Sequence, residues 1–219
     1  MSPYTPRMHT LLVLGAGKIG RMVAHLLASS GDYELRIGDV RREAAEAAVA
    51  HLRSATPIGL AFDSPALLDD AMRGAKAVIS CAPFACNPLI AERARAGGLH
   101  YFDLTEDVAV TKKVAALAKD AKSAFVPQCG LAPGFITIVA NHLIAPMSEI
   151  QDLCLRVGAL PRFPSNRLKY NLTWSTEGLI NEYLNPCDAL VEGEMQSLPA
   201  LEHLERITVA GVQYEAFNT

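Results

Sequence analysis

The stretch Leu11–Gly20, LLVLGAGKIG, leaves few alternatives for the fold of the first half of the chain. Four apolar residues typical of a buried parallel strand run directly into a glycine-rich turn. Gly15 lets the chain turn sharply, Gly17 lets the backbone approach a diphosphate closely, and Gly20 lets the next helix pack on the strand. That helix is expected to begin at Lys18, where its unpaired N–H groups form an anion site. The stretch predicts the first βα unit of a dinucleotide-binding sheet.

A second strand is expected over Tyr33–Asp39, and Asp39 lies 19 residues after Gly20. A carboxylate at this position takes the adenosine ribose hydroxyls of a bound dinucleotide. The alternative is that Asp39 caps the helix that follows. This carboxylate would repel a 2′-phosphate, and Arg41 and Arg42 alone are placed to offset the repulsion. The predicted cofactor is therefore NAD rather than NADP.

Strand and helix patterns alternate through residue 127. Further strands are expected at Ile58–Phe62, Ala77–Cys81, Leu99–Leu104 and Ala124–Pro127, with helices at Arg41–Leu52, from Pro65, at Leu89–Ala96 and around Thr111–Lys119. Repeated βα units of this kind predict an α/β fold, a Rossmann-type doubly wound parallel sheet with right-handed crossovers. Residues 1–127 are thus expected to form a dinucleotide-binding domain.

Ligands of such sheets bind outside the carboxyl ends of the strands, so the candidate cofactor contacts lie there. They are Gly15, Ala16, Gly17, Lys18, Ile19, Gly20, Asp39, Val40, Asp63, Ser80, Cys81, Ala82 and Pro83. Asp63 has two candidate roles. It reaches the adenine amino group, or it caps the helix that begins at Pro65, and capping is favoured.

Residues 128–219 show a different pattern and are expected to form a second, partial α+β domain. The expected elements are a helix over 131–144, a strand at Leu153–Leu160, an irregular loop at Pro161–Arg167, an extended segment at Asn171–Trp174, a helix capped by Ser175, and extended segments at Ala189–Glu192 and Arg206–Val209. A sheet this small exposes unpaired edge groups, which predicts a homodimer through this domain.

Composition and charge narrow the class of protein. The 219 residues carry a net charge of −3 with no Lys/Arg run longer than two, which argues against nucleic acid as a partner. Five scattered cysteines without zinc-like spacing indicate reduced thiols and no metal site. No apolar run is long enough to span a bilayer, and no signal peptide is recognisable. A cytoplasmic protein with a small-molecule substrate is expected.

Five stretches carry a family resemblance. They are VLGAGKIGR (Val13–Arg21), SCAPF (Ser80–Phe84), HYFDLTED (His100–Asp107), CGLAPGF (Cys129–Phe135) and KYNLTWSTEGLINEYLNP (Lys169–Pro186). The first is generic, whereas the last is specific, with its Tyr, its Trp-Ser and the Gly that follows. With these stretches the chain resembles the saccharopine dehydrogenase-like oxidoreductases, most closely the lysine 6-dehydrogenase (lysine ε-dehydrogenase) branch. Chains of that family continue past the equivalent of Thr219, so this sequence resembles a C-terminally truncated member.

The resemblance implies NAD(P)-linked oxidation of an amine on a lysine-derived amino acid, or the reverse reductive amination. Hydride leaves a carbon that bears a neutral amine, so the ammonium must first lose a proton to a base or to water. Asp103 and Glu106 are the candidates to accept that proton or bind the ammonium. Alternatively, Asp103 holds a neighbouring loop and Glu106 is solvated in the first turn of a helix. For Cys81 and Cys129, packing beside the cofactor is favoured over a nucleophilic role.

The candidate substrate contacts lie around the irregular loop of the second domain. They are Arg162, Arg167, Lys169, Asn171, Trp174 and Ser175. Arginine or lysine can hold the substrate carboxylate, and the resemblance singles out Lys169, which is also a catalytic candidate. Trp174 lines the site or, alternatively, belongs to the core. Two functions remain open: an amine dehydrogenase acting on lysine or on saccharopine, and a dinucleotide-binding module or fragment without turnover.

Overall fold

The computed structural model describes residues 8–158, 160–163, 165, 172 and 175–219. By its internal contacts the chain divides into two units, the first running through Phe135 and the second from Ile136 to Thr219. Each unit is described by itself. None of the described helices is both long and apolar enough to cross a membrane.

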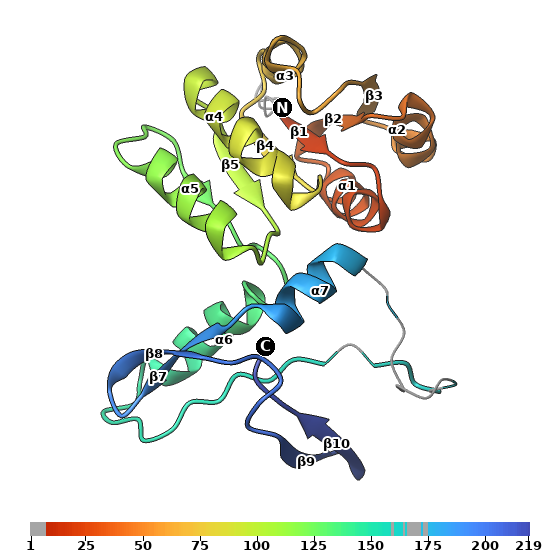
Figure 1. Cartoon of the computed structure of the whole chain (residues 1–219). Helices are drawn as coiled ribbons and strands as arrows, with labels where there is room; N and C mark the ends of the chain where they lie inside the picture. The colour runs from red at the N-terminus through yellow and green to blue at the C-terminus, as the bar shows by residue number, and fades with distance from the viewer. Residues whose placement is uncertain (1–7, 159, 164, 166–171, 173–174) are drawn as a thin grey trace, which may run out of the picture. The chain divides into compact units, whose positions relative to one another are not determined.

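The first unit is built on a parallel sheet. Its described strands are β1 (His9–Leu14), β2 (Tyr33–Asp39), β3 (Ala55–Gly59), β4 (Ala77–Ser80), β5 (His100–Asp103) and β6 (Phe125–Val126). They lie in the order β3-β2-β1-β4-β5-β6, and each neighbouring pair is parallel (Figure 1). This order reverses direction between β1 and β4, which confirms the predicted Rossmann-type doubly wound sheet.

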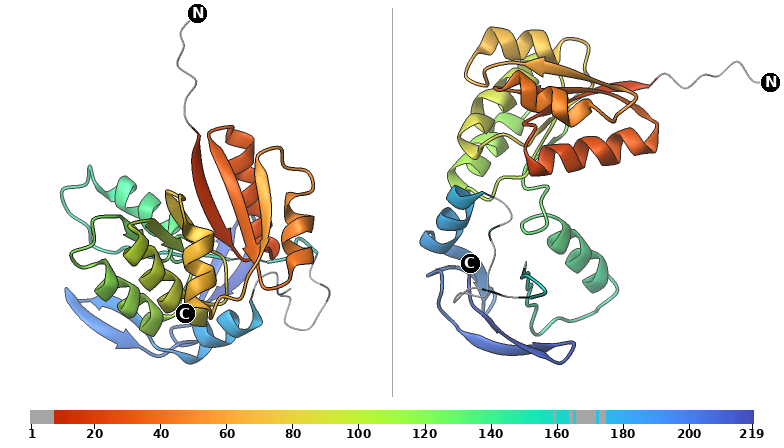
Figure 2. Two further views of the ribbon diagram at one scale, coloured as in Figure 1. Left: turned by 90° about the horizontal axis from the view of Figure 1, so that it is seen from above. Right: turned by 90° about the vertical axis from the view of Figure 1, so that its right-hand side faces the viewer.

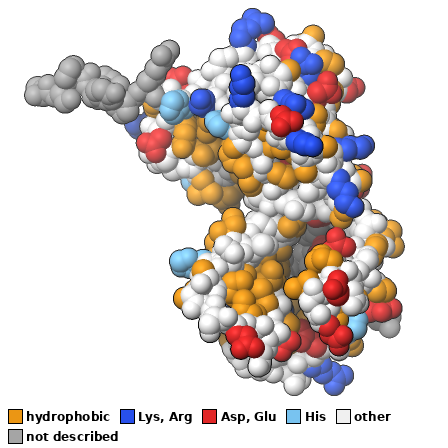
Figure 3. Space-filling view, turned by 90° about the vertical axis from the view of Figure 1, so that its left-hand side faces the viewer, with side chains coloured by type: hydrophobic (Ala, Val, Ile, Leu, Met, Phe, Trp, Pro, Cys, Tyr) orange, Lys and Arg blue, Asp and Glu red, His pale blue; other side chains and the backbone are white. Residues whose placement is uncertain are grey.

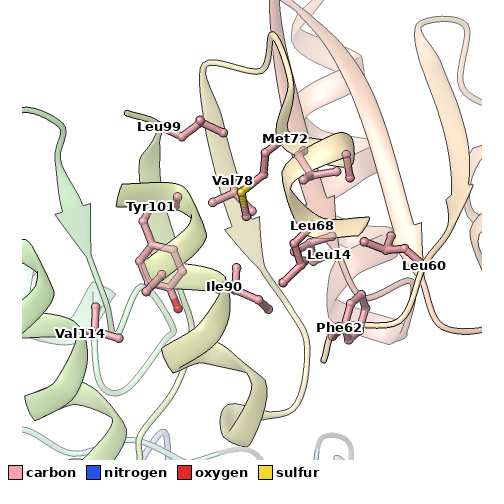
Figure 4. Packing of buried hydrophobic residues seen from close by; sticks show 14 of the residues in the cluster. Leu14, Leu60, Phe62, Leu68, Met72, Val78, Ile90, Leu99, Tyr101 and Val114 are labelled. Atoms are coloured by element: carbon pink, nitrogen blue, oxygen red, sulfur yellow. The ribbon is translucent and has the colours of Figure 1, made fainter. Parts of the chain in front are cut away.

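Helices cover both faces of this sheet (Figure 2). They are α1 (Lys18–Ser30), α2 (Arg42–Val49), α3 (Pro65–Met72), α4 (Asn87–Gly97), α5 (Val108–Ala118) and the short 3-10 helix η1 (Phe84–Cys86). Side chains alternate along β1, so Leu11 and Val13 pack with α1 and α2, whereas Leu12 and Leu14 pack with α3, α4 and α5. Figure 4 shows the second of these two cores, in which Val78 and Tyr101 extend the apolar layer along β4 and β5.

Several predicted boundaries are confirmed, and others are wrong by a few residues. Helix α1 begins at Lys18 as predicted, and Gly31, with φ of 76°, ends it. The third strand runs over Ala55–Gly59 and not over Ile58–Phe62. Pro57 lies inside this strand, which tolerates it because β3 is at the edge of the sheet, where a missing N–H need not break a ladder.

One predicted helix cap and two predicted helix starts also need correction. Ser64, and not Asp63, caps α3, because its hydroxyl accepts a bond from the Leu67 N–H at 3.5 Å. Helix α4 begins at Asn87, two residues before the predicted Leu89, and the buried Asn87 side chain accepts a bond from the Ser80 hydroxyl. Helix α5 begins at Val108, three residues earlier than expected, with the Asp107 carboxylate accepting from the Val110 N–H.

The second unit contains two helices and two hairpins among its described residues. These elements are α6 (Phe135–Ile144, which starts at the last residue of the first unit), α7 (Thr176–Leu184), β7 (Cys187–Val191), β8 (Glu194–Leu198), β9 (Glu205–Val209) and β10 (Val212–Ala216). The cap of α7 is Ser175, as predicted, at 3.1 Å from the Gly178 N–H. The strand expected at Leu153–Leu160 is wrong, since the described residues of that range join no sheet. Alternating apolar residues favour an extended chain, but a strand also needs a partner edge.

Strands β8 and β10 were not expected from the sequence. Each closes a hairpin through two turn residues with positive φ, Glu192-Gly193 and Ala210-Gly211. Two successive positive φ values define the turn that matches the twist of paired antiparallel strands. A glycine at the second position of a two-residue turn between short extended segments was therefore the sequence signal that could have predicted these hairpins.

Candidate functional site

Two of the three glycines in the turn between β1 and α1 are packed tightly against neighbouring backbone atoms. Gly15 has φ of 100°, and a Cβ there would lie 2.5 Å from the carbonyl oxygen of Cys81. A Cβ on Gly20 would collide with the carbonyl oxygen of Gly15. A Cβ on Gly17 would meet no described atom within 4 Å. Gly15 and Gly20 are thus required by packing, whereas Gly17 leaves open space above the turn.

That open space adjoins the start of α1. Gly17 is the N-cap residue, no described side chain caps the helix, and its first turn contains no acidic residue. Lys18 and Ile19 are exposed there, while Ala16 and Gly20 are buried. Helix N–H groups without acceptors and a positive helix end suit an anion, so the turn fits the diphosphate of a dinucleotide.

Asp39 stands at the carboxyl end of β2 beside this turn. Its Oδ2 accepts a hydrogen bond from the Ala16 N–H at 2.8 Å, and its Oδ1 accepts one from the Arg41 N–H at 2.9 Å. The residue is 8% exposed. The N-cap of α2 is Arg41, with no side-chain cap from any described residue, so the capping alternative for Asp39 is wrong. Each carboxylate oxygen keeps a further lone pair that a ribose hydroxyl can use.

The end of β4 contributes packing to the same edge. The Ser80 hydroxyl is buried and donates to Asn87 Oδ1 at 2.7 Å, which turns it away from a ligand role. Burial raises the pKa of the Cys81 thiol to about 12, so it stays protonated near neutral pH and is a poor nucleophile. Ala82 is half-buried, and Pro83 is exposed. The packing interpretation of Cys81 is therefore favoured over the nucleophilic one.

Other predicted residues of this edge reach the surface. Val40 is 62% exposed after β2, and Asp63 is exposed just before α3. Cys129 is also exposed as a residue, but partial burial of its thiol raises its pKa, with a further contribution from the charge of Asp103. Among the described residues, no group of three or more His, Cys, Asp and Glu side chains is placed to hold a metal ion.

Asp103 is fully buried at the end of β5 and accepts three hydrogen bonds through its carboxylate. Oδ2 accepts from the Tyr101 hydroxyl at 2.7 Å, and Oδ1 accepts from the Thr105 N–H at 3.0 Å and the Gln128 N–H at 3.1 Å. Its carbonyl oxygen accepts a fourth bond, from the Cys129 N–H at 2.7 Å. This geometry favours the alternative in which Asp103 holds a neighbouring loop over the role of proton acceptor.

The loop that Asp103 holds is the turn from Gln128 to Phe135, at the end of the first unit. Gln128 has φ of 60°, and the Phe135 N–H donates back to the Gly130 carbonyl at 2.9 Å. A Cβ on Gly134, where φ is 131°, would collide with the backbone of Gly130. These residues form a compact turn in place of the expected first turn of a helix over 131–144.

Glu106 lies between two polar turns that follow β5. The Thr105 hydroxyl accepts from the Asp107 N–H at 3.1 Å, and Asp107 caps α5. Glu106 is half-buried and precedes the N-cap, so it is not in the first turn of α5 as its solvated alternative supposed. Of the two carboxylates proposed for proton transfer, Glu106 is the one that solvent reaches.

Only some of the candidate substrate contacts of the second unit are among the described residues. The Arg162 guanidinium lies 5.5 Å from the centre of the Phe163 ring, a cation–π contact. The Ser175 hydroxyl is engaged as the cap of α7. Arg167, Lys169, Asn171 and Trp174 lie outside the described residues.

Sequence reasoning missed the role of Arg21. Its Nε donates to the Ala16 carbonyl at 3.0 Å, inside the glycine turn. The residue stands directly after Gly20 in the motif, which was the available signal. It also missed Tyr101, although residues two apart on a strand share a face and Tyr101 is two residues from Asp103.

Comparisons with known proteins agree with this arrangement. A family model described as the saccharopine dehydrogenase NADP binding domain matches residues 11–127, and one described as the saccharopine dehydrogenase C-terminal domain matches residues 130–219. The mitochondrial alpha-aminoadipic semialdehyde synthases of Bos taurus and Mus musculus are each 22% identical, over 206 and 193 residues, and cover 90% and 84% of this chain. The match covers 22% and 21% of those proteins.

A solved structure shares the fold. The apo saccharopine dehydrogenase (L-Glu forming) of Saccharomyces cerevisiae aligns with a TM-score of 0.73 at 18% sequence identity. The alignment covers 95% of this chain and 49% of the yeast chain. The chain thus spans about half the length of that structure and about a fifth of the curated relatives.

Proposed function

This chain belongs to the saccharopine dehydrogenase family, and on that premise we propose that it binds NAD and uses it to oxidise an amine of a lysine-derived amino acid. The observation that carries the proposal is the pairing of an uncapped helix start at Gly17 with the carboxylate of Asp39 beside it. The first suits a diphosphate and the second suits the adenosine ribose.

In this proposal, each residue of the site has a separate role in binding or proton transfer. The N–H groups at the start of α1 bind the diphosphate, and Asp39 accepts bonds from the ribose hydroxyls. Bound NAD supplies the hydride acceptor. Glu106, half-buried beyond β5, takes the proton from the substrate ammonium before the hydride leaves. Asp103 acts through the loop that it holds and not on the substrate itself.

Selectivity for NAD over NADP is the first test of this proposal. A 2′-phosphate at the Asp39 carboxylate would meet like charge, so NAD should bind about 10- to 100-fold more tightly. Asp39→Asn removes the charge and should narrow that ratio toward one, while weakening NAD binding. Isothermal calorimetry with both oxidised cofactors measures the ratio. NADP binding as tight as NAD binding by the wild-type chain would contradict the assignment of Asp39 to the ribose.

Substrate choice is the second test. We expect L-lysine to be oxidised in preference to saccharopine, because saccharopine carries three carboxylates that cations must hold. In the described part of the second unit, Arg156 already lies within ion-pair distance of Glu205, and Arg206 lies within ion-pair distance of Glu215. The assay is NADH formation at alkaline pH with each substrate. Glu106→Gln should bind NAD normally and lose at least about 100-fold in rate, the usual contribution of a general base.

The competing substrate assignment rests on the family itself. Both family models and the yeast structure are described as saccharopine dehydrogenases, so saccharopine is the second candidate. Faster turnover of saccharopine than of lysine would select it. NADH formation with neither substrate, together with normal NAD binding, would favour a dinucleotide-binding module without turnover.

A homodimer through the second unit is the third expected result. Among the described hydrophobic residues of this unit, Ala140 alone is buried, whereas Ile138, Leu184 and Leu190 are about 70% exposed or more. Figure 3 shows hydrophobic side chains grouped on the surface of this unit. The hairpins β7–β8 and β9–β10 also have open edges among the described strands. Light scattering after size exclusion should give twice the chain mass, and a monomer at micromolar concentration would contradict this proposal.

A further inference from the structure

Ala16, in the middle of the glycine turn, is held by side chains on both of its peptide groups. Its N–H donates to Asp39 Oδ2 at 2.8 Å, and its carbonyl accepts from Arg21 Nε at 3.0 Å. The preceding N–H, on Gly15, donates to the Gly38 carbonyl at 2.7 Å. Three successive peptide groups of the turn are therefore fixed in orientation.

The bond from Arg21 sets the direction of the next donor. The Ala16 carbonyl and the Gly17 N–H belong to one planar trans peptide group, so they point in opposite directions. Glycine imposes few limits on φ, so Gly17 by itself would let this peptide group rotate. Rotation would turn the carbonyl oxygen toward the open space above the turn, where it would repel a diphosphate.

Arg21 opposes this rotation through its guanidinium, which binds the Ala16 carbonyl. Its backbone N–H donates to the Gly17 carbonyl at 3.0 Å in the first turn of α1, which fixes the next peptide group. One residue thus anchors two successive carbonyls on the helix side of the turn. The Gly17 N–H then faces the side on which a Cβ would meet no described atom.

We propose that Arg21 is a positioning residue for the dinucleotide diphosphate, whose guanidinium holds the Ala16 carbonyl so that the Gly17 N–H faces the ligand. This inference rests on the proposed function, since it places a diphosphate at the turn. Arg21 acts through the backbone. Its effect should therefore follow the presence of the diphosphate and not the total charge of the ligand.

The test compares Arg21→Met with wild type by calorimetry, using NAD, ADP and adenosine as probes. Arg21→Met should weaken NAD and ADP about 10-fold, the effect of losing one charge-assisted hydrogen bond, and leave adenosine unchanged. Arg21→Gln, which keeps an N–H donor without the charge, should recover part of the loss. Arg53→Met is the matched control, because it removes the same charge from an exposed residue and should leave all three affinities unchanged.

Salt separates positioning from direct contact. If Arg21 touched the phosphates itself, the ratio of wild-type to Arg21→Met affinity would fall steeply as salt is raised, because screening weakens exposed charge pairs. A ratio that stays constant supports positioning, and one that collapses overturns it. Equal affinities of Arg21→Met and wild type would also overturn it.

A measurement without ligand separates failure of this inference from failure of the proposed function. In the free protein, the amide signal of Gly17 in a nitrogen–proton correlation spectrum should be sharp for wild type and Arg53→Met. It should broaden or split in Arg21→Met, because the peptide group then exchanges between orientations. An unchanged Gly17 signal would overturn the inference. Failure of wild type to bind NAD and ADP would overturn the proposed function instead.

Discussion

Replacing Gly17 with alanine should weaken NAD binding at least about 100-fold and leave the free energy of unfolding within about 1 kcal/mol of wild type. In the free chain an added Cβ meets no described atom within 4 Å, and the backbone at Gly17, with φ of −71°, suits any residue. The same Cβ would occupy the space that a diphosphate needs at the start of α1. Loss of one or two charge-assisted hydrogen bonds, each contributing about 1.5–3 kcal/mol, accounts for the size of the effect.

Gly20→Ala is the matched comparison, because it adds the same methyl group three residues further along. There the Cβ collides with the Gly15 carbonyl and lies 3.6 Å from the Cys81 Cβ, so α1 must shift away from β1. Overpacking of this kind costs about 1–3 kcal/mol. Gly20→Ala should therefore lower both stability and NAD affinity, whereas Gly17→Ala lowers affinity alone.

Denaturant unfolding and calorimetric titration of the two variants separate these effects. The informative result is the contrast between them. If Gly17→Ala bound NAD as wild type does, the diphosphate would not lie over this turn, and the proposed cofactor site would be wrong. Equal destabilisation by the two variants would show that Gly17 is also needed for packing.

The first unit could be predicted from sequence because its signals are local. The strand before Gly15, the helix after Gly17 and the strand ending at Asp39 each follow from residues within one element and its turn. The exact range of β3 could not be predicted in the same way, because tolerance of Pro57 depends on an edge position that only the assembled sheet defines.

The second unit shows where local signals fail. Leu153, Leu155 and Val157 alternate as strand residues do, yet pairing is a tertiary property that the pattern does not contain. The roles of Arg21 and Asp103 could not be predicted for the same reason. Arg21 was in a recognised motif, but its bond to Ala16 depends on how α1 leaves the turn. The hold of Asp103 on Gln128 joins residues 25 apart in the sequence.

Removing the Asp103 carboxylate should produce a large loss of stability of the first unit. In Asp103→Ala the Tyr101 hydroxyl and the N–H groups of Thr105 and Gln128 lose their buried acceptor. Each unsatisfied buried donor costs about 1–3 kcal/mol, so a loss of about 4 kcal/mol or more is expected. That is a large part of the stability of an ordinary domain. Denaturant unfolding measures it. Tyr101→Phe removes the donor to Oδ2 and leaves both backbone donors paired, so it is expected to cost less, about 1.5–3 kcal/mol.

Asp103→Asn decides whether this residue positions the loop or takes part in proton transfer. Both backbone donors use Oδ1, which asparagine keeps as its carbonyl oxygen, while its amide nitrogen replaces Oδ2 opposite Tyr101. Burial and the nearby carboxylate raise the pKa of Tyr101, so its hydroxyl is protonated and can rotate to accept from that amide. The two backbone donors keep their acceptor, and Tyr101 keeps one hydrogen bond, now as the acceptor, while its own O–H proton loses its partner. The variant should therefore lose about 1–3 kcal/mol, less than Asp103→Ala. NADH formation by Asp103→Asn should then stay near the wild-type rate. If the variant is stable but loses at least about 100-fold in rate, the Asp103 carboxylate itself accepts the proton. If it is as unstable as Asp103→Ala, these hydrogen bonds do not explain the stability of the loop.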